Sequence, residues 1–456
     1  MRQKMNVRKE ALRLLRTAEQ KDAYLSRLLD GALQSSPLSE RDRALLAALV
    51  FGVTEKRVTL DYCIDALCST HEPPGARMRM ILRLGAYQLL FLDRIPPHAA
   101  VAETVALGKS PGERAFLNGL LRTMARKLSF ADTLPRDSAQ SPAAARIAAV
   151  APLPKDPAAL KSVLYALSPE VIRLFEDNLG DRAEDALLAL AAPPPTTICV
   201  NTLRLDAHTA LERLAQAGIP AKRCPDAPRS ILILQTIAYA SIEAALGAGN
   251  FFVQDEASQL AVTALAPRAG ETGADVCACP GSKSFHAALL MENTGRIFSS
   301  DIHESKLSLI QSGAEKLGIG CLDICAHDAR TARPELCGKC DFVICDVPCS
   351  GLGVLAKKPD IRHRCASLPE KLAPIGYAIL CAAAEYLRPG GRLLYSTCTL
   401  TKIENEDNYH KFLQTHAGFA PLDFEAGGVR SRGGCATLLP NGTRDGFFFG
   451  LIVRGE

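Results

Sequence analysis

The sequence predicts a multidomain protein in which an all-α bundle precedes a small α+β subdomain and a C-terminal α/β domain. Three observations indicate this order. Apolar residues recur at helical spacing through the first 130 residues. A stretch rich in Pro, Ala, Ser and Asp follows and is typical of a linker. After residue 251, strand-like apolar runs alternate with helical patterns, which predicts a parallel sheet with helices on both faces. The expected boundaries are 1–135, 136–158 (linker), 159–255 and 256–456.

The N-terminal bundle is predicted from a series of helical segments. Leu and Ala residues between 11 and 29 share one helical face. Ser39-x-x-Asp42 is a capping box before the next helix. The run 81–92 is almost wholly apolar, so we expect it at the centre of the bundle. Pro96-Pro97 ends it, and further helices are expected at 99–107 and 118–126.

Charge is unevenly distributed along the chain. Residues 1–130 hold 21 Lys and Arg against 13 Asp and Glu, a balance of +8, although the whole chain carries only +4. A basic N-terminal third is typical of a protein that binds nucleic acid. A solvated helical surface would give the same count, so charge alone leaves both interpretations open.

The middle of the chain mixes both element types. Helices are expected at 169–179 and 183–191, and the triple proline 193–195 should end the second. The apolar runs 197–201 and 231–234 read as strands, with a helix at 207–218 between them. These elements predict the small α+β subdomain.

The C-terminal domain is expected to alternate strands and helices. A helix over 372–387 should be stopped by Pro389-Gly390-Gly391. The other expected helices are 260–265, one from 285, and 305–317, and the expected strands are 274–277, 296–301, 323–328, 342–346 and 392–396.

Two cysteines follow two of these strands. The strand ending at Asp346 continues as Val-Pro-Cys349-Ser-Gly-Leu-Gly353, and the last strand is followed by Cys398. Each cysteine alone would be expected as a small buried hydrophobe. The flanking proline and glycines, however, let the backbone approach a ligand. Since ligands bind at the carboxyl edge of such sheets, both thiols are expected to face one pocket.

A second loop predicts a nucleotide-like cofactor. The loop 277–284 follows the first strand of the domain, and Asp301 ends the second, where a carboxylate can hold ribose hydroxyls. The glycine pattern of a dinucleotide site is absent, and only the tail of a phosphate loop is present. S-adenosylmethionine, with a ribose and an adenine but no phosphate, fits better. Asp328 would then face the adenine.

The chain resembles known families along its whole length. The N-terminal bundle resembles the RNA-binding domain of the antitermination factor NusB in the segments 84–89, 95–99 and 118–122 and at Glu103. The C-terminal domain resembles the Sun/RsmB family of RNA cytosine-C5 methyltransferases in the segments 277–283, 346–351, 395–398, 404–405 and 445–448. The fold that this implies is a NusB-like bundle, an RNA-clasping α+β subdomain and a Rossmann-like methyltransferase domain.

The resemblance also implies an activity and a set of site residues. The implied enzyme is an S-adenosyl-L-methionine-dependent 16S rRNA cytosine-C5 methyltransferase. Cys398 would be the attacking thiolate, Cys349 would help release the product, and Asp346 would contact the cytosine or the cofactor. The implied cofactor-binding residues are Cys277, Ala278, Cys279, Pro280, Gly281, Ser282, Lys283, Asp301, Asp328 and Asp346. The implied partner is small-subunit ribosomal RNA.

Several positions depart from the family pattern. Cys279, Ser282 and Ser284 alter the cofactor loop, Cys199 stands where an arginine is usual, and Gly376 where a glutamine is usual. One alternative is therefore a catalytically weakened RNA-binding or ribosome-assembly protein that keeps the methyltransferase fold. A DNA cytosine methyltransferase is a further alternative, which the paired cysteines and the basic bundle disfavour.

The remaining expectations concern surroundings and assembly. Cys321-x3-Cys325 and Cys337-x2-Cys340 resemble zinc spacing, but their ligands would have to converge from a strand and two loops, so no metal is expected. The N-terminus does not read as a secretory signal, and no apolar run is long enough to span a membrane. Sixteen cysteines without such a signal indicate reduced thiols in the cytoplasm. We expect a cytoplasmic monomer.

Overall fold

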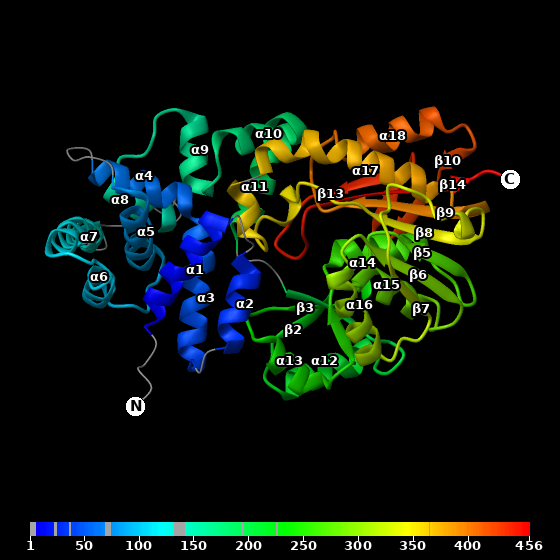
Figure 1. The fold of residues 1–456 in the computed structure, drawn as a ribbon, viewed down its shortest axis with the longest axis horizontal. Helices are drawn as coiled ribbons and strands as arrows, with labels where there is room; N and C mark the ends of the chain where they lie inside the picture. The colour runs from blue at the N-terminus through cyan, green and yellow to red at the C-terminus, as the bar shows by residue number, and fades with distance from the viewer. Residues whose placement is uncertain are drawn as a thin grey trace. The chain divides into compact units, whose positions relative to one another are not determined.

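The structure is a computed structural model of the whole chain. It describes residues 6–21, 25–35, 38–68, 74–131, 142–192, 196–224, 227–363 and 365–456. Most of the proline- and serine-rich part of the predicted linker, and the triple proline 193–195, lie outside these residues. The chain forms two compact units, 1–173 with 358–363, and 174–357 with 364–456. Each unit is described by itself (Figure 1).

The first unit is all-α, as the sequence predicts. Its helices are α1 (Val7–Lys21), α2 (Leu25–Ser35), α3 (Glu40–Glu55), α4 (Arg57–Leu67), α5 (Ala76–Phe91), α6 (Pro97–Val105), α7 (Pro111–Ala131), α8 (Pro142–Val150) and α9 (Pro157–Tyr165). The buried face of α1 repeats at helical spacing through Ala11, Leu14, Leu15 and Ala18. Ser39 caps α3 by accepting a hydrogen bond from the amide of Asp42, which confirms the predicted capping box.

Helix α5 is central to this unit. Eight of its apolar or small residues from Met80 to Leu90 are buried together with Arg83 and Gln88. Close packing against α3 requires a glycine at position 52, because a Cβ there would overlap the ring of Tyr87. The Arg83 guanidinium is compensated by Asp61 on α4, with two hydrogen bonds of 2.8 Å.

Part of the predicted linker is structured. Residues 142–150 form α8, and its side chains Ile147 and Val150 are buried in the core of the first unit. The Lys127 ammonium on α7 also donates to the Val150 carbonyl. The composition of this stretch, rich in Ala, therefore reflects a short packed helix rather than a continuous linker.

A short segment that is distant in sequence, residues 358–363, belongs to the first unit. Residues 358–363, which include the 3₁₀ helix η4 (Pro359–His363), lie among its helices. The Arg362 side chain is buried and donates to the carbonyl of Tyr165. The Asp360 carboxylate accepts from the amide of Leu25. Nothing in the sequence pattern predicts this insertion.

The second unit contains the predicted small α+β subdomain. Its four-stranded sheet has the order β2-β3-β1-β4, with every pairing antiparallel. Its elements are η1 (Gly180–Arg182), α11 (Ala183–Ala191), β1 (Thr196–Val200), α12 (Ala207–Gln216), β2 (Ala221–Cys224), β3 (Ala227–Ile233), α13 (Tyr239–Leu246) and β4 (Phe251–Val253). They are preceded by α10 (Pro169–Leu179), which begins in the first unit and enters the second at Leu174. The sequence reading missed the short β2, α13 and β4.

The larger sheet of this unit carries the strand ends that matter for function. Its order is β10-β14-β9-β8-β5-β6-β7, with β13 paired to β14. Its elements are α14 (Glu256–Leu265), β5 (Thr272–Asp275), α15 (Ser282–Leu290), β6 (Arg296–Asp301), α16 (Glu304–Leu317), β7 (Leu322–Ala326), β8 (Cys340–Asp346), α17 (Leu368–Ala384), β9 (Leu387–Thr397), α18 (Glu406–Thr415), β10 (Phe419–Pro421), β13 (Cys435–Leu438) and β14 (Phe447–Arg454). A separate hairpin joins β11 (Phe424–Ala426) and β12 (Val429–Ser431).

Two expectations for this sheet need correction. Strands β5 to β9 pair in parallel, as predicted, but β14 runs antiparallel to β9, so the sheet is mixed. The helix before the last predicted strand ends at Ala384, and Pro389-Gly390-Gly391 lies within β9. The register of β9 against β8 shifts between Cys340 and Phe342, and this irregularity accommodates the proline and the glycines.

Helices cover both faces of the large sheet (Figure 1). Helices α17 and α18 lie on one face, and α14, α15 and α16 lie on the other. Strand β8 alternates between the two cores: Phe342 and Ile344 pack on one side, and Val343 and Cys345 on the other. Burial on both faces explains why this strand reads as a continuous apolar run.

No helix in the described part of the chain combines the length and the apolar character that crossing a bilayer requires.

The ion pair between Arg83 and Asp61 is expected to contribute to the stability of the first unit. Asp61→Ala should lower the free energy of unfolding by about 3 kcal/mol, because it removes both hydrogen-bonded contacts of a buried guanidinium and leaves Glu19, 3.9 Å away, as its counter-charge. Asp65→Ala, one turn along the same helix, removes a more exposed partner of Arg79 and should cost below about 1 kcal/mol. Urea unfolding of the intact chain followed by far-ultraviolet circular dichroism measures both, and equal losses would contradict the assignment.

Candidate active site

The predicted site residues follow the carboxyl ends of the parallel strands β5 to β9. The Cys277 thiol lies just beyond β5, and the causes of its pKa shift identify the charged groups around it. Its pKa is raised well above the usual value by burial and then by four neighbouring carboxylates, those of Asp275, Asp346, Asp301 and Asp328. The sheet therefore brings together three carboxylates predicted from the sequence and a fourth, Asp275, that was not.

The loop 276–281 between β5 and α15 turns tightly beside β6. The Ala278 amide donates to the Ser300 carbonyl at 2.8 Å, and the Gly281 amide donates back to the Ala278 carbonyl at 2.6 Å. Gly281 has φ +112°, and a Cβ there would overlap the ring of Phe285. Only glycine suits both constraints, so the backbone at this turn stays open toward the strand edge.

Asp275, at the end of β5, is buried and supported by hydroxyl groups. Ser284 donates to its carboxylate at 2.7 Å, and Ser299 donates to the Ser284 hydroxyl at 2.9 Å. Burial raises the pKa of Asp275 to about 7 despite the hydrogen bond from Ser284. Ser284, one of the departures from the family pattern, therefore keeps a hydroxyl where this carboxylate needs one. In the sequence, only the position of Asp275 at the end of a predicted strand could have indicated that it belongs to the site.

Asp301 and Asp328 differ in their surroundings. One oxygen of Asp301 accepts from the amide of His303. The Asp328 carboxylate accepts from the guanidinium of Arg330 at 2.6–3.1 Å, and these hydrogen bonds lower its pKa to about 2. The group predicted to face an adenine is thus already paired with an arginine that the sequence reading did not single out.

Asp346 is held from two sides at the end of β8. Lys283, from α15, donates to one oxygen at 2.7 Å, and the Ser396 hydroxyl donates to the other at 2.7 Å. Burial lowers the pKa of Lys283, but the charge and hydrogen bond of Asp346 outweigh it, so the net pKa is raised. The lysine stays charged at neutral pH, and its ammonium also lies 5.3 Å from the Phe447 ring centre.

The two thiols predicted to share a pocket are in contact. Their Sγ atoms are 3.4 Å apart. The pKa of Cys349 is raised well above its usual value, first by the hydrogen bond with Cys398, then by burial and by the charges of Glu404 and Asp346. Contact and burial thus favour the protonated form of this thiol pair, and either sulfur can donate to the other.

Glu404 joins the two cysteine-bearing loops. Its carboxylate accepts from the Ser350 amide at 2.8 Å, from the Ser350 hydroxyl at 2.6 Å and from the Thr401 hydroxyl at 2.6 Å. The hydroxyls of Ser350 and Thr399 lie 2.7 Å apart. Ser350 follows one thiol and Thr399 follows the other, so this buried carboxylate ties the two loops together. The sequence reading noted Glu404 in a motif without assigning it a role.

Other departures from the family pattern have structural explanations. Cys199 is buried in β1, and burial raises its pKa to about 12, so it is a packed core thiol. Gly376 on α17 lies against Val347: a Cβ there would be 3.2 Å from a Val347 methyl group. Among the described residues, no three His, Cys, Asp or Glu side chains are grouped to hold a metal ion.

Comparisons with known proteins agree with this geometry. The model of "16S rRNA methyltransferase RsmB/F" matches residues 262–453, that of the NusB family matches 5–126, and that of the RsmF/B-like ferredoxin-like domain matches 171–240. The "Probable ribosomal RNA small subunit methyltransferase B" of Bacillus subtilis is 33% identical over 427 residues, covering 92% of this chain and 90% of that one. The chain belongs to the RsmB/F methyltransferase family. The ribosomal RNA small subunit methyltransferase B of Yersinia enterocolitica is 30% identical and is covered over its full length.

A solved structure shows the same fold as this RsmB/F family member. The crystal structure of PH0851 superposes with a TM-score of 0.77 at 22% identity, covering 100% of both chains. The predicted family, the three-part fold and S-adenosyl-L-methionine as the cofactor of this methyltransferase are thereby confirmed. The individual site residues and the domain boundaries stay predictions.

The Glu404 contacts generate a prediction. Glu404→Gln should slow methyl transfer about tenfold or more and lower stability by about 1.5–3 kcal/mol, because an amide cannot accept all three hydrogen bonds. Glu406→Gln is the control: Glu406 lies on the neighbouring helix and accepts from Thr437, away from the thiols. Unfolding and single-turnover methylation assays measure both effects, and equal rate losses in the two variants would remove Glu404 from the site.

Proposed function

We propose that this protein methylates carbon 5 of a cytosine in small-subunit (16S) ribosomal RNA through a covalent adduct with Cys398. The observation that carries the proposal is the pair of thiols in contact at adjacent strand ends, beside Asp346 and Lys283. A methyltransferase acting on an oxygen or an exocyclic nitrogen has no use for two cysteines placed in this way. Carbon 5 of cytosine is a poor nucleophile, and a thiolate is the group that can activate it.

The carboxyl edge of β5 to β8 fits S-adenosylmethionine. The open turn at Gly281 would let the backbone approach the ligand. In this proposal Asp301 binds the ribose hydroxyls, and Asp328, which is paired with Arg330, faces the adenine. Cys277, Ala278, Cys279, Pro280, Ser282 and Lys283 would complete this cofactor site. When bound, the cofactor supplies an electrophilic methyl group.

Cys398 and its neighbours perform the first part of the proposed reaction. The Cys398 thiolate adds to carbon 6 of the cytosine, a carbon–sulfur bond forms, and the electron pair of the double bond moves to carbon 5. Carbon 5 then accepts the methyl group. Asp346, fixed by Lys283 and Ser396, is within the same site and would orient the polar edge of the base.

Cys349 acts in the second part. The proton on carbon 5 leaves to water, the double bond reforms and the bond between carbon 6 and Cys398 breaks. The raised pKa of Cys349 keeps it protonated, so it acts as a general acid toward the departing sulfur 3.4 Å away. After this transfer Cys398 is a thiol and Cys349 is a thiolate. Return of the proton from Cys398 to Cys349 restores the thiolate at Cys398 and the thiol at Cys349.

The RNA partner is supported by separate parts of the chain. The NusB-like first unit is the basic part of the sequence, with +8 over residues 1–130. The relatives named above are small subunit ribosomal RNA methyltransferases. The alternative is an RNA-binding protein with weakened catalysis, motivated by Cys279, Ser282 and Ser284 in the cofactor loop; of these, Ser284 retains a hydrogen bond to Asp275. Bisulfite sequencing of ribosomal RNA from cells with and without the protein tests the choice between them.

The assigned thiol roles predict opposite behaviour of two variants. Cys349→Ala should accumulate a denaturant-resistant protein–RNA adduct, because release is slowed while addition is intact. Cys398→Ala should form none, because the attacking sulfur is gone. Denaturing gel electrophoresis with labelled RNA reads both variants, and an adduct in both, or in neither, would show that the roles are wrong.

The cofactor assignment predicts a third effect. Asp301→Ala should weaken S-adenosylmethionine binding by about ten- to a hundredfold, since a charge-assisted hydrogen bond contributes about 1.5–3 kcal/mol. RNA affinity should be unchanged. Asp323→Ala is the control. Asp323 lies on β7 and pairs with Arg296 on β6 at the surface, so this variant should bind the cofactor normally. Calorimetry showing equal cofactor affinity in both variants would exclude Asp301 from the site.

A further inference from the structure

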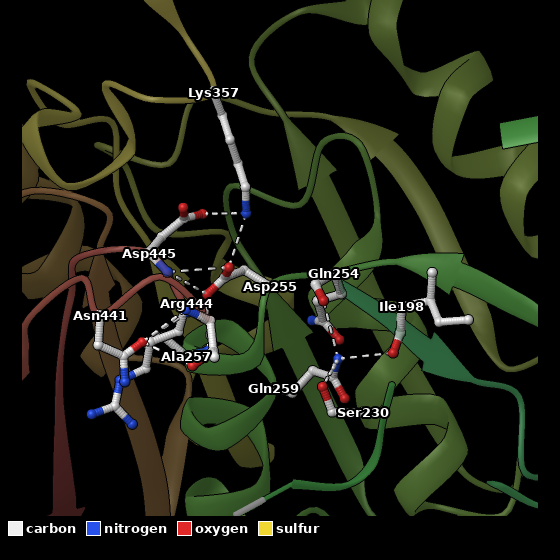
Figure 2. A network of polar contacts seen from close by, with 11 residues as sticks. Ile198, Ser230, Gln254, Asp255, Ala257, Gln259, Lys357, Asn441, Arg444 and Asp445 are labelled. Atoms are coloured by element: carbon white, nitrogen blue, oxygen red, sulfur yellow. Dashed lines mark hydrogen bonds and ion pairs between the residues drawn. The ribbon is translucent and has the colours of Figure 1, made fainter. Parts of the chain in front are cut away.

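A lysine bridges two carboxylates close to the catalytic loops, in a cluster that the proposed reaction does not use. The Lys357 ammonium lies 2.7 Å from an oxygen of Asp445 and 2.9 Å from an oxygen of Asp255 (Figure 2). The Asp445 amide also donates to the Asp255 carboxylate. We call Lys357, Asp255 and Asp445 the lysine clamp. Its members come from three distant parts of the second unit.

The Asp445 arm of the clamp leads to the attacking thiol through backbone contacts. The next residue, Gly446, donates its amide to the Gly353 carbonyl at 2.9 Å, and the Gly353 amide donates to the Cys398 carbonyl at 3.0 Å. The two glycines touch so closely that a Cβ on Gly353 would overlap the Gly446 carbonyl. Displacement of Asp445 would therefore be transmitted to the backbone of Cys398.

The Asp255 arm leads to the cofactor loop. Asp255 caps α14 by accepting from the amide of Ala257. Its neighbour Gln254 donates its side-chain amide to the carbonyl of Ser282, the first residue of α15, at 3.2 Å. The lysine clamp thus connects the segment beside the cofactor loop with the segment beside Cys398.

The third arm is the loop that carries Cys349. This loop begins at the end of β8, and Lys357 is its last residue in the second unit, because the chain enters the first unit at Lys358. The start of the loop is fixed by the sheet, and Lys357 fixes its end. The ion pairs therefore hold the end of this loop to Asp255 and Asp445 within the second unit.

The charges in the lysine clamp make the bridge necessary. Only 13% of the Asp255 side chain and 8% of the Asp445 side chain are exposed, so two largely buried carboxylates depend on one ammonium group. Burial and the facing Asp255 raise the pKa of Asp445 to about 7. Removing the ammonium would raise the pKa of Asp445 further, so Asp445 would bind a proton and the ionic bridge to Asp255 would be lost.

We propose that Lys357 is a positioning residue for methyl transfer, which holds the Cys349 loop, the Cys398 loop and the cofactor loop in one arrangement by bridging Asp255 and Asp445. The inference rests on the proposed function, because the arrangement that it describes is that of the two thiols and the cofactor site. Lys357 acts through these neighbours and does not itself touch the reacting atoms. An ordinary stabilising ion pair would affect folding alone.

The test compares Lys357→Met, Lys357→Arg and Lys358→Met in the full chain. Lys358→Met is the matched control, because it removes the same charge one residue along and is exposed in the first unit. Lys357→Met should lower the single-turnover methylation rate at saturating RNA and cofactor by about tenfold, which corresponds to about 1.4 kcal/mol. Dissociation constants for RNA and S-adenosylmethionine should change less than about twofold. Lys357→Arg, whose fork can span two carboxylates, should recover most of the rate.

Alkylation of the thiols by iodoacetamide, read by peptide mass spectrometry, measures the arrangement without any methylation. Cys349 and Cys398 should be modified faster in Lys357→Met than in the wild type, while core cysteines such as Cys199 are unchanged. If the wild type does not methylate cytosine but this difference is found, the proposed function fails and the positioning inference stands. Unchanged alkylation with an unchanged rate would overturn the inference.

Two further outcomes decide the remaining alternatives. Equal rate losses in Lys357→Met and Lys358→Met, together with weaker RNA binding, would make Lys357 an RNA contact and overturn the inference. If Lys357→Met does not fold, the double variant Lys357→Met, Asp445→Asn removes one charge of each sign. It should fold and still transfer methyl groups slowly, because the bridge is lost. A double variant with the wild-type rate would also overturn the inference.

Discussion

The parallel pairing of β8 with β9 is the constraint on which the rest of the site depends. Cys345 pairs with Tyr395 and Asp346 with Ser396, so both strands end at the same edge of the sheet. Cys349 follows Asp346 by three residues, and Cys398 follows Ser396 by two. Because the register fixes these starting points, Cys349 and Cys398 meet although 49 residues separate them. A shift of the register by one residue would turn Ser396 away from Asp346 and separate the thiols.

Several buried or half-buried carboxylates around this edge have specific partners. Lys283 faces Asp346, Glu404 accepts from an amide and two hydroxyls, and Asp275 is supported by Ser284. Each group is largely shielded from water, so it would be costly without its partner. The same partners also fix orientation, since a carboxylate with several short hydrogen bonds has few other positions available. Stabilisation and positioning of the site therefore come from the same contacts.

The sequence predicted what depends on local pattern and on motif. The helices before residue 131, the strands β5 to β9 and the loops that carry Cys277, Asp346, Cys349 and Cys398 all have periodicity or flanking glycine and proline that indicate them. Contacts between distant segments have no such signal. Glu404 was visible as a motif residue, but its hydrogen bonds to Ser350 depend on the fold. Lys357, Asp255 and Asp445 are spread over 190 residues and appear as a cluster only in three dimensions. The antiparallel β14 was also missed as part of the sheet, because pairing direction is not a property of one strand.

The insertion of residues 358–363 into the helical unit limits how the two units of this protein can be exchanged. A front domain joined only end to end can be lost or replaced by cutting the chain once. Here the helical unit is completed by residues that are encoded nearly two hundred positions later, and Arg362 and Pro359 are buried in it. Swapping the front domain for another would require a matching change in the middle of the catalytic gene segment. The two units are therefore expected to have diverged together, as one inherited piece, rather than as interchangeable modules.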